Sequence, residues 1–322
     1  MLKPLTIGCA TLIALAVAFW SWPTKPKATP AVVTAAQPMR EHPVQPATRL
    51  PVNPGSAALP SVASPRQRMR TAKDYFQLAL LLLAQAKAGN AEAQYVLFTT
   101  IMDCRSGTDG VYGEFESLEK AREYAAIHNR PTEEADTLFE RCHGFHTPAA
   151  SVLGSPWEWL QKATDAGYPA AQAVTASERL NQNQLKALLP PWIPPDGVVA
   201  MPPIGGDADP RALLAEALPS GDPDVLEVIG QLQHTLHPEE SREQALLDRT
   251  AWLYLACQRG RDCSELGPTS PINCTATETN CLGVPAVLLQ MAHDNWARVQ
   301  DRLNQLNAAL EGEHWDQLGF GP

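Results

Sequence analysis

The pattern of apolar and polar positions changes twice along this chain. An uncharged apolar run extends from Leu5 to Trp22, residues 23–65 show almost no periodicity, and helical periodicity begins at Arg66. From Arg66 onward, apolar residues recur three and four positions apart, which is the spacing of one face of a helix. The pattern therefore predicts a membrane-length N-terminal segment, an irregular linker and an all-α remainder.

The first helical unit is predicted to cover residues 70–103. The face of its first helix that we expect to be buried consists of Phe76, Leu80, Leu83 and Ala84. Gly89-Asn90 should end this helix, because glycine followed by asparagine favours a turn. A second helix should then run from Ala91 to Asp103. Its expected core positions are Ala93, Leu97 and Ile101.

A short phrase occurs twice in the helical part of the chain. The two copies are AKAGNAEAQYVL (residues 86–97) and ATDAGYPAAQAV (residues 163–174). In each copy an alanine precedes the glycine, which is Gly89 in the first copy and Gly167 in the second. Ala-Gln follows at the fourth and fifth positions after the glycine, so Gln94 and Gln172 occupy equivalent positions. Glycine at such a place is expected to end the first helix in a left-handed cap. The small alanines would allow the second helix to pack closely on the first.

Weaker echoes of the phrase place Gly221 and Gly260 after further apolar helices, at irregular spacings. These residues resemble the Sel-one-like subclass of tetratricopeptide-type helical repeats, in which a helix ending in Ala-x-x-Gly precedes an Ala-x-x-x-Ala-Gln helix. The resemblance is good over 78–104 and 156–180 and faint later. It implies an irregular, α-solenoid-like array of helix pairs that binds other proteins, in a bacterial protein that is membrane-anchored or periplasmic. In such repeats the glutamine can tie adjacent helices together.

The N-terminal apolar run has the length of a membrane span. As a helix, Leu5–Trp22 would extend about 27 Å, close to the roughly 30 Å hydrocarbon core of a bilayer. Trp20 and Trp22 suit the membrane–water interface. We therefore interpret residues 1–22 as an uncleaved signal anchor. The alternative is a signal peptide cleaved near Ala18, which would leave a soluble periplasmic or secreted protein.

Proline marks the predicted domain boundaries. Residues 23–65 contain ten prolines and are interpreted as a disordered stalk. Residues 189–210 contain three proline doublets and Trp192, and form a predicted connection, because proline interrupts a helix. The helical part is thereby divided into an N-terminal helical-repeat half, 66–188, and a C-terminal helical half, 211–322.

Six cysteines follow the predicted export segment, and an even number in that context indicates disulfides. They are Cys104, Cys142, Cys257, Cys263, Cys274 and Cys281. We predict that the first two are bonded to each other. The other four form a cluster with three possible pairings, of which the short intervening loops favour first with second and third with fourth. A four-cysteine zinc site is the alternative, but the usual Cys-x-x-Cys spacing is missing, so no metal or cofactor is predicted.

Charge and motifs restrict the function. Five basic residues and one acidic residue precede position 66, which leaves 20 basic and 34 acidic residues in 66–322, a net charge of −14. Nucleic-acid binding is not expected, because it depends on neutralising phosphates. The sequence has no nucleophile elbow, no His-Glu-x-x-His pair and no phosphate-binding glycine loop.

The sequence thus favours a non-catalytic protein- or peptide-interaction module of the bacterial cell envelope. Two alternatives are an envelope enzyme with an unrecognised active site and a stalked assembly accessory of an envelope machine. Gln94 and Tyr95 are expected on the exposed or semi-exposed side of the first repeat. Tyr95 and Trp192 are the candidate partner contacts, because aromatic residues are enriched at interfaces.

The predicted topology is a single inner-membrane pass with the C-terminal domain in the periplasm. A phosphatase that folds only outside the cytoplasm should therefore be active when fused to the C-terminus. Activity of a cytoplasm-only reporter at the same junction would contradict this orientation.

Overall fold

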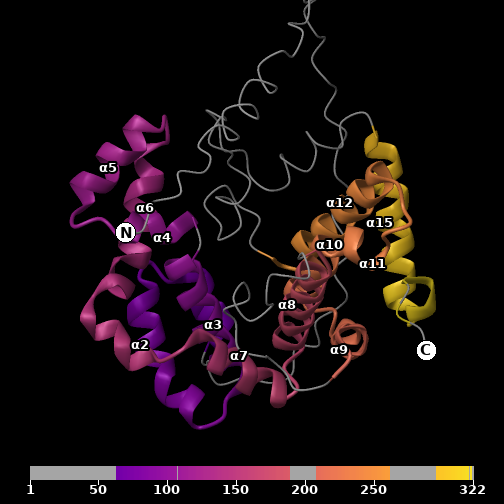
Figure 1. The fold of residues 1–322 in the computed structure, drawn as a ribbon, viewed down its shortest axis with the longest axis horizontal. Helices are drawn as coiled ribbons and strands as arrows, with labels where there is room; N and C mark the ends of the chain where they lie inside the picture. Colours follow the sequence, from indigo (N-terminus) through magenta and orange to yellow (C-terminus); the bar gives the residue numbers. More distant parts are fainter. Residues whose placement is uncertain (1–62, 107, 189–207, 262–294, 319, 321–322) are drawn as a thin grey trace, which may run out of the picture. The chain divides into compact units, whose positions relative to one another are not determined.

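The computed structural model describes residues 63–106, 108–188, 208–261 and 295–318, together with Phe320. All of these residues belong to one unit of the chain, Pro60–Pro322. Within these ranges every regular element is a helix and no strand is present, so the predicted all-α class is confirmed there (Figure 1).

The helices are α1 (Pro65–Thr71), α2 (Tyr75–Lys87), α3 (Ala91–Ser106), α4 (Thr108–Gly113), α5 (Leu118–Ile127), α6 (Thr132–Cys142), η1 (His143–His146), η2 (Pro148–Leu153), α7 (Pro156–Asp165), α8 (Pro169–Leu188), α9 (Pro210–Ala217), η4 (Leu218–Ser220), α10 (Pro223–Gln231), α11 (Gln233–Leu236), α12 (Arg242–Gln258), α15 (Trp296–Glu311) and η6 (Trp315–Leu318).

Local sequence sets many of the helix starts. A serine or aspartate immediately before the helix accepts a hydrogen bond from the first turn at Ser64, Asp74, Ser117, Asp209, Asp222 and Ser241. Such caps satisfy backbone N–H groups that lack partners inside the helix. At Ser64 the cap is reciprocal, because the Gln67 side chain accepts from the Ser64 N–H. Helix α1 therefore begins at Pro65, the last residue assigned to the stalk from the sequence.

The predicted left-handed caps are confirmed. The glycines of the phrase and of its echoes all have positive φ: 92° at Gly89, 74° at Gly167, 60° at Gly221 and 103° at Gly260. After three of them the next N–H reaches back to the helix, from Asn90 to the Gln85 carbonyl, from Tyr168 to Ala163 and from Arg261 to Ala256. This is the Schellman arrangement, which satisfies carbonyls at the end of the helix.

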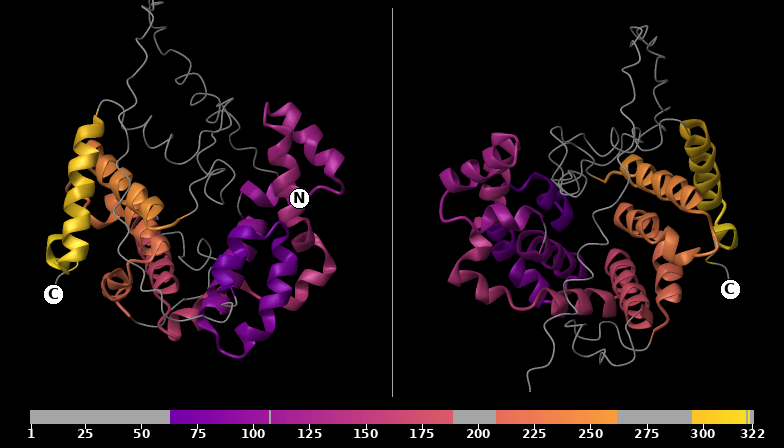
Figure 2. Two further views of the ribbon diagram at one scale, coloured as in Figure 1. Left: turned by 180° about the vertical axis from the view of Figure 1, so that it is seen from behind. Right: turned by 45° about the horizontal axis from the view of Figure 1, so that its top comes forward.

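Helices α2 and α3 pack side by side, as do α3 and α7 (Figures 1 and 2). Ala93, Leu97 and Ile101 are fully buried, as predicted. The predicted face of α2 is right in part: Phe76 is buried and Leu83 is partly buried, but Leu80 is 38% exposed and Ala84 is exposed. The residues of α2 that are buried are Tyr75, Phe76, Leu78, Ala79, Leu82 and Ala86. Helix α2 is apolar almost all round, so spacing alone did not select a face. Packing against α3, α6, η1 and η2 selects it.

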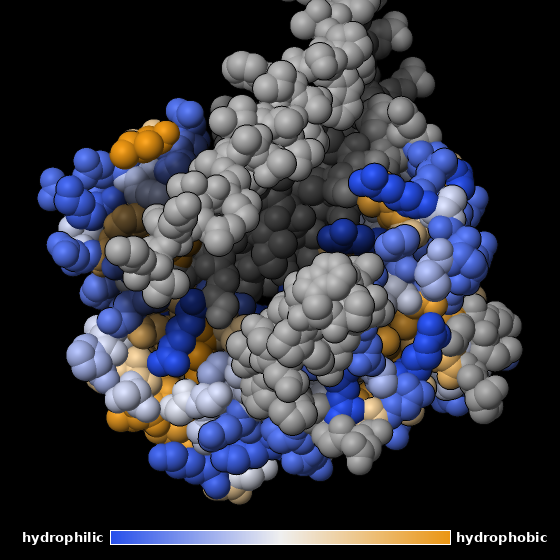
Figure 3. Space-filling model, in the orientation of Figure 1, coloured by the Kyte–Doolittle hydropathy of each residue, from blue (hydrophilic) through white to orange (hydrophobic). Residues whose placement is uncertain are grey.

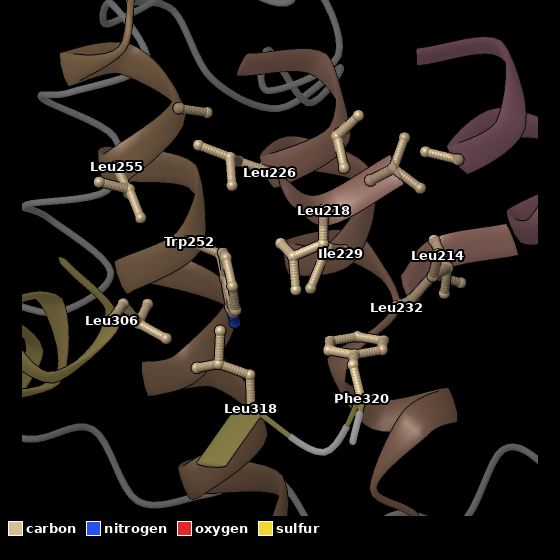
Figure 4. Close-up of a cluster of buried hydrophobic side chains, with 14 of the residues drawn as sticks. Leu214, Leu218, Leu226, Ile229, Leu232, Trp252, Leu255, Leu306, Leu318 and Phe320 are labelled. Atoms are coloured by element: carbon tan, nitrogen blue, oxygen red, sulfur yellow. The ribbon is translucent and has the colours of Figure 1, made fainter. Parts of the chain in front are cut away.

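A second core joins α9, α10, α12 and α15, with Trp252 at its centre (Figure 4). Gly230 on α10 lets α12 approach closely, since a Cβ there would lie only 2.8 Å from the Trp252 Cβ. Trp252 is 1% exposed and is surrounded by apolar residues of the neighbouring helices, among them Leu226, Ile229 and Leu318.

The predicted bond between Cys104 and Cys142 is confirmed. Their Cα atoms lie 5.0 Å apart, and both residues are fully buried. The bond joins the end of α3 to the end of α6, which ties in the small cluster formed by α4, α5 and α6. Closing a loop of this length stabilises the folded chain by about 4 kcal/mol in the loop-entropy view. Cys257 is also disulfide-bonded, while Cys263, Cys274 and Cys281 lie outside the described residues.

Several predicted segments lie outside the described residues: the anchor at 1–22, the stalk up to residue 62, and the connection at 189–207 with Trp192. Among the helices that are described, none is long and apolar enough to cross a membrane.

The cap at Gly89 generates a stability prediction. Gly89→Ala should lower the free energy of unfolding by about 1 kcal/mol, because a Cβ disfavours the left-handed conformation. Gly89→Asn is the matched control and should lose less, since asparagine tolerates this conformation. Denaturant unfolding measures both. Equal losses for the two variants would show that backbone conformation is not the cause.

Candidate functional site

An ion-pair network lies where α1, α3, α10 and the end of α12 meet. Helix α10 supplies most of its acidic groups. Asp222 caps the helix by accepting from the Asp224 N–H at 2.9 Å, and Pro223 occupies the first helical position. This start places Asp224 and Glu227 three residues apart on one helix face.

Two arginines from distant parts of the chain enclose Asp224. Arg66 of α1 pairs with Asp224 and also with Asp222, where its Nη2 lies 3.1 Å from Oδ1. Arg261 lies 3.0 Å from Asp224 Oδ1 through its Nη1 and pairs with Glu227 as well. The Tyr95 hydroxyl of α3 donates to Asp224 Oδ2 at 3.0 Å. Asp224 therefore connects four segments that are far apart in sequence.

Burial affects the two carboxyl groups differently. Burial disfavours the charge on Asp224, but Arg261, Arg66 and the Tyr95 hydroxyl outweigh it and hold the Asp224 pKa below its ordinary value. Burial raises the pKa of Glu227 to about 7, with Arg261 opposing the rise. One guanidinium is shared between the two acids, and Asp224 has the second guanidinium in addition. Asp224 thus stays charged at neutral pH, while Glu227 titrates there.

The left-handed cap of α12 positions Arg261. Its N–H donates to the Ala256 carbonyl at 3.0 Å, directly after Gly260, so the backbone direction at Arg261 is fixed. The same device occurs after α5. There Asn129 has φ 54°, and the Arg130 N–H donates to Ala125 while its side chain pairs with Glu134. An arginine directly after a left-handed cap is a recurring way to aim a guanidinium in this protein.

The network borders a cavity of about 260 Å³, here called the α3–α10 cavity. Its charged lining includes Arg66, Arg70, Arg141, Asp224, Glu227 and Arg261. Tyr75 and Tyr95 are its aromatic residues, and Met69, Val96, Val174 and Val228 are its apolar ones. The Arg141 guanidinium lies over the Tyr75 ring, 5.0 Å from the centroid. The cavity thus combines aromatic surface with charges of both signs.

The predicted exposure of Tyr95 and Gln94 is wrong. They are 4% and 5% exposed, because α3 is packed between α2 and α7 and also against α1. Tyr95 nevertheless lines the cavity with its hydroxyl engaged. The glutamines do tie helices together: Gln94 Nε2 donates to the Ala86 carbonyl at 2.9 Å, and Gln172 Nε2 to Glu216 at 3.1 Å.

The charged residues of the network were not predicted from the sequence. Two local signals were present: Asp222-Pro223-Asp224, which is typical of a helix start, and the basic run from Arg66. Neither signal predicts that these two segments lie next to each other in the folded protein. Of the predicted contacts, Tyr95 lies in the network, and Trp192 lies outside the described residues.

Comparison with protein-family models, with curated proteins and with solved structures found no match for this chain. Within the described ranges, no group of three or more His, Cys, Asp and Glu residues could hold a metal ion. The site is therefore interpreted from its own geometry.

Glu227 generates a pH prediction. With the pKa raised from about 4.3 in the unfolded chain to about 7, the folded protein holds a proton that the unfolded chain has released. The associated stability is complete below about pH 4 and is lost as pH rises through 7. The free energy of unfolding should fall by up to roughly 3 kcal/mol from pH 5 to pH 8. Denaturant unfolding at several pH values measures this.

Glu227→Gln should remove most of this pH dependence, because the side chain no longer ionises. Glu158→Gln, at an exposed position on α7, is the control and should leave it unchanged. An unchanged slope in Glu227→Gln would assign the dependence to another group.

Proposed function

We propose that this protein is a non-catalytic interaction module of the bacterial cell envelope, which binds a protein or peptide partner on the periplasmic side. The observation that carries the proposal is the α3–α10 cavity. Its volume of about 260 Å³ suits one or two side chains of a partner. Its lining is rich in tyrosine and arginine, which are enriched where proteins bind one another.

The helix pairs support an irregular helical-repeat architecture of the Sel-one-like kind. Pairs α2/α3 and α7/α8 share a left-handed glycine cap at the turn. Both also carry a glutamine that ties its helix to another, Gln94 in α3 and Gln172 in α8. Arrays of such pairs bury one face and leave another available for a partner.

The disulfide supports the cellular location. A fully buried bond between Cys104 and Cys142 requires an oxidising compartment during folding, such as the periplasm. Together with the apolar run Leu5–Trp22, it favours a domain exported across the inner membrane. The proline-rich residues 23–65 would then space the domain from the bilayer.

The surface is compatible with specific contact. On the face shown in Figure 3, blue hydrophilic residues predominate and orange areas interrupt them. Large apolar side chains with at least a third of their surface exposed are Leu80, Leu81, Val111, Ile127 and Val152. A partner could therefore make apolar contacts elsewhere on the surface in addition to polar ones in the cavity.

Filling the cavity tests the proposal. Thr99→Trp, on the cavity wall, should reduce recovery of crosslinked partner from intact envelopes about tenfold, because a large side chain occupies the space. Gln231→Trp, on the exposed rim, is a second variant with a smaller effect on folding. Gln77→Trp, exposed on α2 and outside the cavity lining, is the control and should have no effect.

Undiminished recovery with both cavity variants, in protein shown to be folded, would overturn the proposed binding surface. Turnover of a substrate by the purified protein alone would overturn the non-catalytic function.

A further inference from the structure

Positive charge is concentrated around α1, although residues 66–322 carry a net charge of −14. Residues 66–73 contain four basic residues and no acidic one. Arg259 and Arg261 follow at the end of α12, and Arg261 pairs with Asp224, as Arg66 does. A local basic region in an acidic domain is the first sign of an anion site.

A second hollow lies beside α1, with a volume of about 370 Å³ and open to solvent; it is here called the α1 hollow. Its lining includes Arg66, Gln67, Arg70, Tyr168 and Arg259. Arg66 and Arg70, one helical turn apart, also line the α3–α10 cavity. The two spaces therefore share two guanidinium groups.

The bare backbone of Gly260 brings Arg70 close to the end of α12. A Cβ on Gly260 would lie 3.9 Å and 4.0 Å from the two terminal nitrogens of Arg70. Arg259 and Arg261 flank this glycine in sequence. Three guanidinium-bearing residues thus gather around one short backbone segment.

These three arginines differ in the hydrogen bonds and ion pairs that they make. Arg261 is neutralised by Asp224 and Glu227. Among the described residues, Arg259 has only an amide oxygen, Asn307 Oδ1, at 3.3 Å. Arg70 makes no hydrogen bond or ion pair within the described chain. Both side chains are exposed and line the α1 hollow, and arginine stays charged at any physiological pH, so the hollow presents two positive charges that an anion can pair with.

We propose that the α1 hollow binds a carboxylate of the partner peptide, between Arg70 and Arg259. The inference rests on the proposed interaction function and names the chemistry that its site recognises. A planar guanidinium can hold a carboxylate through two parallel hydrogen bonds. The carboxylate belongs either to an Asp or Glu side chain or to the C-terminus of the partner.

The surrounding acids favour a single negative charge over a phosphate dianion. Glu92 lines the α1 hollow and accepts the Arg66 backbone N–H at 3.0 Å. Asp222 contacts the Arg66 guanidinium, with its Oδ1 3.1 Å from Nη2. Because Coulomb energy is proportional to charge, a dianion meets twice the repulsion from these carboxylates that a single negative charge meets.

The test is a binding titration of the full-length protein with four probes. They are an end-blocked peptide with one glutamate, the same peptide with glutamine, a peptide whose only anionic group is its C-terminal carboxylate, and inorganic phosphate. The glutamate peptide or the C-terminal peptide should bind and the glutamine peptide should not. The stronger of the two identifies the source of the carboxylate.

Arg70→Ala should weaken that binding about tenfold or more, because it removes a charge-assisted pair. Arg70→Lys should recover part of it, and Arg259→Gln is a second variant that should also weaken it. Arg249→Ala, exposed on α12 and outside both linings, is the control and should change nothing. Added salt should weaken binding in the unaltered protein.

Equal binding of the glutamate and glutamine peptides, tighter binding of phosphate, or no effect of Arg70→Ala and Arg259→Gln would overturn the inference. Envelope crosslinking separates this result from the proposed function. If the Arg70→Ala variant still captures the partner that the unaltered protein captures, the carboxylate site is wrong and the interaction function stands. If Thr99→Trp and Gln231→Trp leave that capture intact, the proposed binding surface itself is wrong.

Discussion

The meeting of α1, α3, α10 and the end of α12 depends on one partly buried carboxylate, Asp224, held between Arg66 and Arg261. Through these two partners and the Tyr95 hydroxyl, a single side chain of α10 connects α1, α3 and the end of α12. Because Asp224 has three partners, removing either arginine would weaken the compensation of its charge but would not abolish it. The seven-residue helix α1 makes few other contacts that could hold it to α10. Its link to α10 is therefore electrostatic, while Met69 packs against the apolar core formed with α2 and α3.

Backbone geometry prepares this network before the charges meet. The left-handed cap at Gly260 turns the chain so that Arg261 leaves α12 at a fixed point, and the aspartate cap at Asp222 fixes where α10 begins. The same arrangement of a left-handed cap, an arginine and a glutamate occurs at Asn129, Arg130 and Glu134. Aiming long, flexible side chains from fixed backbone positions lowers the entropy lost when they pair. The ion pairs are thus preorganised by helix ends.

The network leaves the two spaces beside α1 with different properties. On the α3–α10 side the acids nearly balance the arginines, and Glu227 changes charge near neutral pH. On the α1 hollow side the cations Arg70 and Arg259 have no carboxylate partner in the part of the chain that the structure describes. One side is therefore suited to aromatic and neutral polar side chains and the other to an anionic group. A peptide that crosses α1 could use both.

The sequence by itself determined the helical class, the glycine caps, the core positions Ala93, Leu97 and Ile101, and the bond between Cys104 and Cys142. Each of these follows from local spacing, from backbone conformation or from counting cysteines. The buried face of α2 was decided by the tertiary structure, because a helix that is apolar almost all round has no single face that its sequence marks for burial. The burial of Tyr95 was decided in the same way, because the sequence does not show that other helices pack on both sides of α3. The network was decided in the same way. Arg66 lies 156 residues from Asp222 in sequence, and only the packing of α1, α3, α10 and α12 brings such charges within hydrogen-bonding distance.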